Sequence, residues 1–217
     1  MSRDNAFVSR PLRVAVELTG SGHHPAAEGA PGTRPINGAD YWVDLTADST
    51  DQLDLTSFPP NVVRIRASDL REAQQERARI RAELVADGRD PDSVTVLVDL
   101  EVLIAGEARA ARKELALLDS ALDAPRAPVS LQYIGTPVGL AGLIADIQAA
   151  GVADGVTVLP LSLPRVLAQL VDGTLPWLEE RGLVTSAAAV DEALRRFDLP
   201  PPRAGTGIVT RSVAVVR

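Results

Sequence analysis

The sequence contains no cysteine, a single lysine (Lys113) and few aromatic side chains. Aromatic residues make up 3% of its 217 residues, whereas 46% of the residues are hydrophobic. The absence of cysteine excludes disulfides, thiolate metal sites and cysteine nucleophiles. With so few aromatic residues, the core has to be built from Val, Leu, Ile and Ala.

The chain also lacks clustered positive charge and long apolar runs. Its formal net charge is −7 at pH 7, and no basic run offsets it. Binding to a phosphate backbone needs clustered positive charge, which disfavours a nucleic-acid partner. No apolar run reaches the roughly 20 residues that a membrane-spanning helix requires. We therefore expect a soluble cytoplasmic protein without a membrane partner.

Short apolar runs rich in β-branched residues predict the strands. Four of them are clear, and a shorter fifth strand is expected near the segment VSLQYIG. The four clear strands are predicted at residues 12–18, 62–66, 94–104 and 156–160.

Helical patterns follow these strands. Ser68 or Asp69 is a suitable N-cap for the first helix, which Gly88 ends. Thr136 and Pro137 suit the cap and first position of another helix, because proline at that position loses no needed donor. Further helices are expected at residues 107–122 and 165–182. The alternation of strands and helices predicts a parallel α/β protein.

Three segments have weaker patterns. Residues 19–40 are rich in Gly, Pro and small side chains, and so long a connection indicates a functional or disordered loop. A short helix is expected around residues 41–45, and an edge strand at residues 212–216. One or two helical turns are expected before that edge strand.

Three segments occur in an order that is typical of one enzyme family. The chain opens with LRVAVELTGSGHHPAA, and VVRIRASDLREAQQERARIRAELVADGRDPDSVTVLVDLEVLIA follows. A GTP turn, an amphipathic helix, AGVADG, an apolar strand ending in LP, and LPWLEERGL complete the order. Together they resemble the luciferase-like, flavin-dependent monooxygenase family. The resemblance implies a TIM-type (β/α) barrel that uses reduced FMN, or a deazaflavin, and no metal to oxidise a small organic substrate.

The middle of such a barrel has no counterpart here. A complete barrel has eight strands in roughly 250 residues, but strands two to five are missing between Asp44 and Pro60. Val156 and Glu28 stand where the family usually has Phe and Trp. We expect an α/β fold, an incomplete TIM-type barrel with about four to five parallel strands and outer helices. A homodimer would cover its open strand edges.

This fold is expected to form a single domain over residues 1–217. The domain divides into a first-strand segment with its loop, a carboxyl-terminal half-barrel and a tail. These parts are predicted at residues 12–45, 60–185 and 186–217.

His23 and His24 are the candidate catalytic residues. They are the only histidines and follow the first strand, where barrel enzymes gather their catalytic groups. A histidine there can act as an acid or a base. The alternative is two solvated residues in a glycine-rich loop. Two adjacent histidines without a third ligand do not make a convincing metal site.

Asp99 and Glu101 interrupt an apolar strand at alternate positions, so their side chains point to the same side. Arg64 and Arg66 alternate in the same way. We expect the four to form one charged cluster that faces the substrate or flavin. If the half-barrel is open, the same face is simply solvated, and the cost of burying unpaired carboxylates favours that interpretation.

Three functions remain open. The first is a flavin-dependent monooxygenase or oxidoreductase, which the resemblance implies. The second is a non-catalytic flavin-binding remnant, and the third is a partner subunit without activity. The missing strands favour the last two, whereas the surviving segments favour the first.

Overall fold

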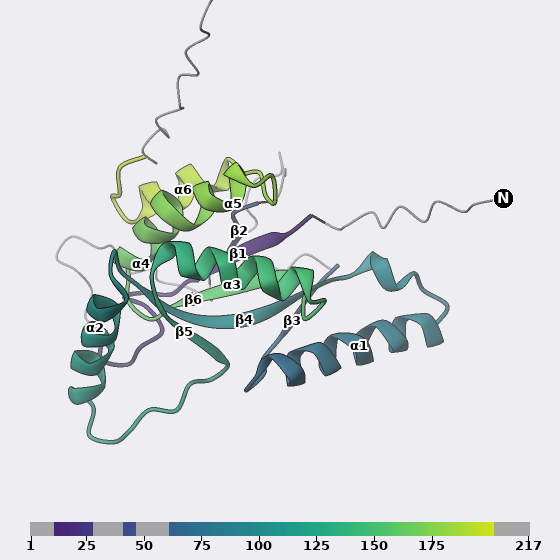
Figure 1. Cartoon of the computed structure of the whole chain (residues 1–217), viewed down its shortest axis with the longest axis horizontal. Coiled ribbons are helices and arrows are strands. Elements are labelled where there is room, and N and C mark those ends of the chain that lie inside the picture. Colours follow the sequence, from purple (N-terminus) through teal and green to yellow (C-terminus); the bar gives the residue numbers. More distant parts are fainter. Residues whose placement is uncertain (1–10, 28–40, 47–60, 202–217) are drawn as a thin grey trace, which may run out of the picture.

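The structure is a computed structural model that describes residues 11–27, 41–46 and 61–201 (Figure 1). They contain one six-stranded sheet with the strand order β2-β1-β6-β4-β3, and β5 pairs with β4. All pairings are parallel except that of β1 with β2. The strands are β1 (Arg13–Leu18), β2 (Tyr41–Asp44), β3 (Val62–Ile65), β4 (Thr95–Ile104), β5 (Leu131–Gly135) and β6 (Gly155–Pro160).

The four strands that are clear in the sequence form the parallel centre of the sheet. They lie side by side in the order β3-β4-β6-β1. The sheet curls as half of a barrel does, with the helices outside it (Figure 1). The prediction of an α/β fold built as a partial TIM-type barrel is confirmed.

Two short strands share one edge of β4. Residues 97 and 98 of β4 pair with both β3 and β6, and residues 100–102 pair with both β5 and β6. Since a strand has two edges, β3 and β5 must follow one another along the edge opposite β6. Ser130 closes the junction, because its hydroxyl accepts from the Ala67 N–H (3.2 Å) and donates to the Asp99 carbonyl (2.8 Å).

The helices begin where the sequence provides caps. Asp69 accepts a hydrogen bond from the Glu72 N–H (2.8 Å), and Thr136 accepts one from the Gly139 N–H (3.2 Å). The helices are α1 (Leu70–Ala86), α2 (Ala108–Ser120), α3 (Pro137–Ala149), α4 (Arg165–Gln169), α5 (Leu175–Glu180) and α6 (Ala189–Arg196).

The helix predicted at residues 165–182 is interrupted. A π-helical turn, Leu170–Thr174, separates α4 from α5. It lies against the start of α3, where a Cβ at Gly173 would be 2.7 Å from the Cβ of Pro137. The Thr174 hydroxyl donates to the Pro137 carbonyl (3.1 Å). The widened turn thus brings this backbone close to α3, which an apolar periodicity does not predict.

The core lies between the convex face of the sheet and the helices. Valines at alternate positions of β1, β4 and β6 are fully buried, which is the expected pattern for a strand with one face on the core. Leu140, Ile144 and Ile147 of α3 join the same core. No helix within the described ranges is long and apolar enough to cross a membrane.

The prediction of a short helix at residues 41–45 is wrong. These residues form β2, which pairs antiparallel with β1, so that Trp42 lies opposite Glu17 and Asp44 opposite Ala15. Pairing satisfies the backbone groups on the open edge of β1, and five residues are too few for periodicity to distinguish the two structures. The strand predicted at residues 212–216 and the substitution at Glu28 lie outside the described residues.

A second polar cluster lies at the amino-terminal ends of the strands. Asp154, just before β6, accepts hydrogen bonds from the Val96 N–H (2.9 Å), Arg77 (2.8 Å) and Arg81 (3.0 Å). Burial raises the pKa of Asp154, but these hydrogen bonds and the two positive charges outweigh burial and hold it below its ordinary value.

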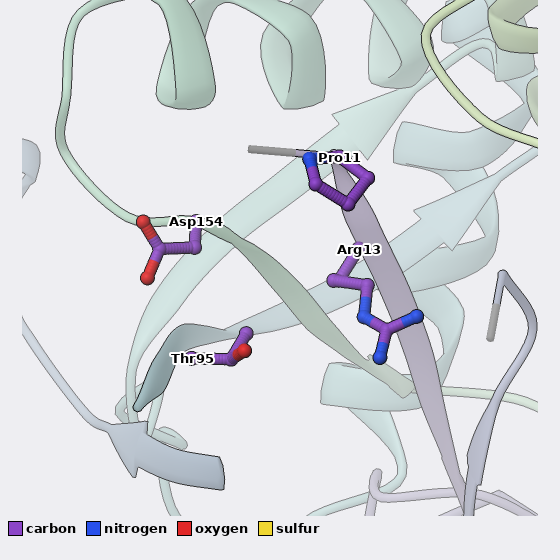
Figure 2. Close-up of a pocket in the computed structure, with 4 residues that line it drawn as sticks. All are labelled: Pro11, Arg13, Thr95 and Asp154. Atoms are coloured by element: carbon purple, nitrogen blue, oxygen red, sulfur yellow. The ribbon is translucent and has the colours of Figure 1, made fainter. Parts of the chain in front are cut away.

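A pocket of about 240 Å³ opens beside Asp154, lined also by Pro11, Arg13 and Thr95 (Figure 2). In TIM-type barrels this end of the strands serves stability rather than catalysis. We therefore treat Asp154 and its partners as a structural cluster.

Replacing Asp154 by Ala is expected to lower the free energy of unfolding by about 3 kcal/mol at neutral pH, because two arginines and a backbone N–H lose a buried partner. Urea unfolding measures the loss. Because the folded-state pKa is lowered, this stabilisation is present above the ordinary aspartate pKa and disappears as the pH falls through the folded-state value. The loss should therefore shrink in acid. Glu83→Gln, at an exposed ion pair with Arg79, is the control and should cost less than about 1 kcal/mol.

Candidate functional site

The concave face of the sheet carries the charged side chains. Asp99 on β4 lies opposite Thr157 on β6, which in turn lies opposite Ala15 on β1. Because side chains alternate along a strand, Glu17 points to the same face as Ala15. Arg64 on β3 pairs with Leu97 and joins that face as well.

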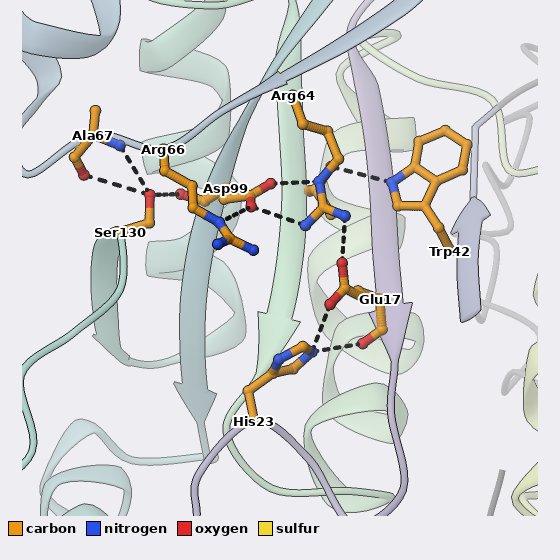
Figure 3. A network of polar contacts seen from close by, with 9 residues as sticks. Glu17, His23, Trp42, Arg64, Arg66, Ala67, Asp99 and Ser130 are labelled. Atoms are coloured by element: carbon orange, nitrogen blue, oxygen red, sulfur yellow. Dashed lines mark hydrogen bonds and ion pairs between the residues drawn. The ribbon is translucent and has the colours of Figure 1, made fainter. Parts of the chain in front are cut away.

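Arg64 links the two acids. Its Nε and Nη2 donate to the two carboxylate oxygens of Asp99 (2.7 and 2.9 Å), and its Nη1 donates to Glu17. Arg66 approaches Asp99 from the other side through its Nε (3.1 Å), as Figure 3 shows. Burial lowers the pKa of Arg64, but its bonds to Asp99 and the two negative charges outweigh burial and raise the pKa above the ordinary value.

Glu101 lies on the same face but belongs to a separate ion pair. Arg126 donates to both of its carboxylate oxygens (2.9 and 2.7 Å). The Val129 N–H (3.1 Å) and the Gln132 amide (3.2 Å) also donate to it. Burial raises the pKa of Glu101, but these hydrogen bonds outweigh burial and hold it below the ordinary value.

The expected charged cluster is thus present in part. The structure brings Arg64, Arg66 and Asp99 together, but it pairs Glu101 with Arg126 instead. The solvated interpretation is wrong for the two acids, since Asp99 and Glu101 are each 1% exposed. Their burial is compatible with folding because both are paired and hydrogen-bonded.

Sequence reasoning missed Glu17 and Arg126. Glu17 interrupts an apolar strand in the same way as Asp99 and Glu101, so the same signal was available for it. Arg126 lies 25 positions after Glu101 in the proline-containing loop before β5, and no local pattern marks it as a partner.

The loop after β1 is fixed against the loop after β6. The N–H groups of His23 and His24 donate to the carbonyls of Pro160 (2.7 Å) and Leu161 (3.1 Å). Gly22 between them has φ +123°, and a Cβ there would lie 2.7 Å from the Leu161 carbonyl oxygen. Glycine is therefore required for this close approach, which places both histidines at the carboxyl ends of the strands.

The two histidines have different surroundings. The side chain of His24 is fully buried; its Nδ1 accepts from the Ala26 N–H (3.1 Å) and its Nε2 donates to Asp119 (3.0 Å). His23 is partly exposed, and its Nε2 faces the Glu17 carbonyl (3.2 Å). Among the described residues, the Nδ1 of His23 has no hydrogen-bond partner. His24 therefore anchors the loop, whereas His23 has a nitrogen available for a ligand.

The part of the chain that the structure describes holds no group of three or more acidic or histidine side chains placed to bind a metal ion. The available chemistry of the concave face is therefore that of arginine, carboxylate and imidazole groups.

Comparison with solved structures places this half-barrel. EDTA monooxygenase (EmoA) from Chelativorans sp. BNC1 matches with a TM-score of 0.52 and 19% identity, over 64% of this chain and 44% of that one. Riboflavin lyase (RcaE), solved with modified FMN and riboflavin, matches with a TM-score of 0.50 and 18% identity, over 63% and 42%. The fold is that of the luciferase-like, flavin-dependent monooxygenases. DmoA from Hyphomicrobium sulfonivorans matches this luciferase-like fold with a TM-score of 0.50 and 16% identity, over 63% and 41%.

The resemblance seen in the sequence is thereby confirmed at the level of the fold. No family model matches the sequence, and no curated protein matches it. The chain spans less than half the length of the luciferase-like structures that it matches.

Replacing His24 by Ala is expected to lower the free energy of unfolding by about 2–3 kcal/mol, because a fully buried side chain and two hydrogen bonds are lost. His23→Ala is the matched control and should cost less than about 1 kcal/mol, since that ring is partly exposed. Urea unfolding of both variants measures the difference. Equal losses would contradict the assignment of His24 as the anchor.

Proposed function

We propose that the protein is a flavin-dependent oxidoreductase of the monooxygenase type, which acts on a small organic substrate with reduced flavin and oxygen. The observation that carries the proposal is the position of His23. In a luciferase-like fold, it presents an unpartnered ring nitrogen at the carboxyl ends of the parallel strands, beside the charged concave face. This is the end of the strands where enzymes with barrel folds hold their substrates.

The residues present fit an anionic flavin such as FMN, and a deazaflavin with a phosphate group would meet the same donors. Arg66 has 64% of its side chain exposed, and only its Nε is engaged, by Asp99. Its two terminal amino groups can therefore donate to a phosphate group. Bound flavin would supply the electrons that activate oxygen, whereas the protein would orient the ring and exclude water. Imidazole and guanidinium groups suffice for these tasks, and the proposal invokes no metal.

A second candidate is a remnant that binds flavin without catalysis or serves as a partner subunit. The chain spans less than half of the structures that it matches. In addition, Arg64 is committed to Glu17 and Asp99, so a ligand that displaced it would leave buried carboxylates unpaired. These two observations favour binding at the edge of the concave face rather than within it.

Flavin binding separates the candidates from a protein without any flavin site. Titrating the protein into FMN should quench the flavin fluorescence saturably at micromolar concentrations. Arg66→Ala should weaken binding about tenfold, because one charge-assisted contact is lost. Arg79→Ala, on the exposed face of α1, is the control and should leave binding unchanged.

Consumption of oxygen by the complex with reduced FMN would then separate the enzyme from the remnant. Without quenching up to high micromolar concentrations of folded, monodisperse protein, the oxidoreductase proposal fails.

The proposal includes a cytoplasmic homodimer. Within the described ranges, β3 pairs with β4 alone, so its outer edge is available to another strand. Sedimentation equilibrium should give twice the chain mass of 22.9 kDa. A monomer over the whole concentration range would contradict the homodimer without affecting the flavin site.

A further inference from the structure

We propose that Glu17 is the positioning residue for His23. It would fix the hydrogen of the imidazole on Nε2 and leave Nδ1 as the proton acceptor at the carboxyl ends of the strands. The inference rests on the proposed function only for the identity of the molecule that gives up the proton. The carboxylate and the imidazole themselves lie within the described residues.

The hydrogen-bond partners determine the form of the ring. The Nε2 of His23 lies 3.2 Å from the Glu17 carbonyl oxygen, which can only accept a hydrogen bond. The neutral ring therefore carries its hydrogen on Nε2, and the Nδ1 lone pair remains free. The Thr19 hydroxyl lies 3.3 Å from the same Nε2 and can accept from it as well.

The carboxylate of Glu17 faces the same ring nitrogen. Its Oε1 is 3.6 Å from the Nε2 of His23, and its other oxygen accepts a hydrogen bond from Arg64 (Figure 3). Arg64 also holds Asp99, which contacts Arg66. Glu17, Asp99, Arg64 and Arg66 thus combine two negative and two positive charges, and the network is neutral before His23 takes up a proton.

Proton uptake is favoured by this arrangement. When Nδ1 accepts a proton, a bond from nitrogen to hydrogen forms and the donor keeps the electron pair as its conjugate base. The positive charge that appears on the ring lies beside the Glu17 carboxylate, in a site where water screens the attraction poorly. Glu17 therefore stabilises the protonated ring through Nε2 without contacting the proton donor.

The ring is also held in place before a ligand arrives. The His23 N–H donates to the Pro160 carbonyl (2.7 Å), and the Leu163 N–H donates to the Ser21 carbonyl (2.7 Å). These bonds fix the backbone on both sides of Gly22, so the direction of Nδ1 is set by the fold. Such preorganisation spares the cost of ordering the base during the reaction.

Two histidines make the test direct, because NMR titration of the ring protons resolves only His23 and His24. We expect Glu17→Gln to lower the proton affinity of His23 about tenfold, since the ring loses the charge beside it. Glu101→Gln is the matched control: a buried glutamate of the same face, paired with Arg126, that should leave His23 unchanged. Equal effects of the two substitutions would overturn the proposal.

The wild-type protein provides a second test, which holds even if a variant fails to fold. Nitrogen chemical shifts of the His23 ring above its titration range should identify hydrogen on Nε2. Hydrogen on Nδ1 would overturn the proposal. Neither readout needs flavin. Failure of the flavin titration therefore refutes the proposed function alone, whereas failure of these measurements refutes the role of Glu17 alone.

Discussion

Neutralisation of Asp99 is the constraint on which the concave face depends. This carboxylate lies in the middle of the longest strand at 1% exposure, where an unpaired charge would cost several kcal/mol. Arg64 resolves the problem with two parallel hydrogen bonds, and its remaining donor reaches Glu17. Glu17 in turn lies against His23. A requirement of folding thus determines where the imidazole and the neighbouring charges lie.

The central strands and the capped helices could be predicted from local sequence. Runs of β-branched residues between glycine and proline identify β1, β3, β4 and β6, and Asp69 and Thr136 mark two helix starts. The strand β2 could not be predicted in this way. Its five-residue neighbourhood is compatible with a helix, and the open edge of β1 decides the outcome.

The candidate site was predictable only as far as alternation reaches. Asp99 and Glu101 point to one face because strands alternate, but their different arginine partners depend on the path of the loop before β5. His23 and His24 are indistinguishable in composition and position along the chain. They differ because neighbouring residues of the pinned loop direct their side chains differently, one toward Asp119 and the other toward Glu17.

The parallel pairing of β1 with β6 has a consequence for biosynthesis. Arg13 pairs with Gly155, so β1 leaves the ribosome long before its central neighbour exists. Until then only the antiparallel contact with β2 can protect it, and its buried valines would otherwise be open to aggregation. Contacts that span so much of the chain also slow folding. The nascent protein therefore depends on an early hairpin-like pairing, and possession of β2 is as much a matter of safe synthesis as of final stability.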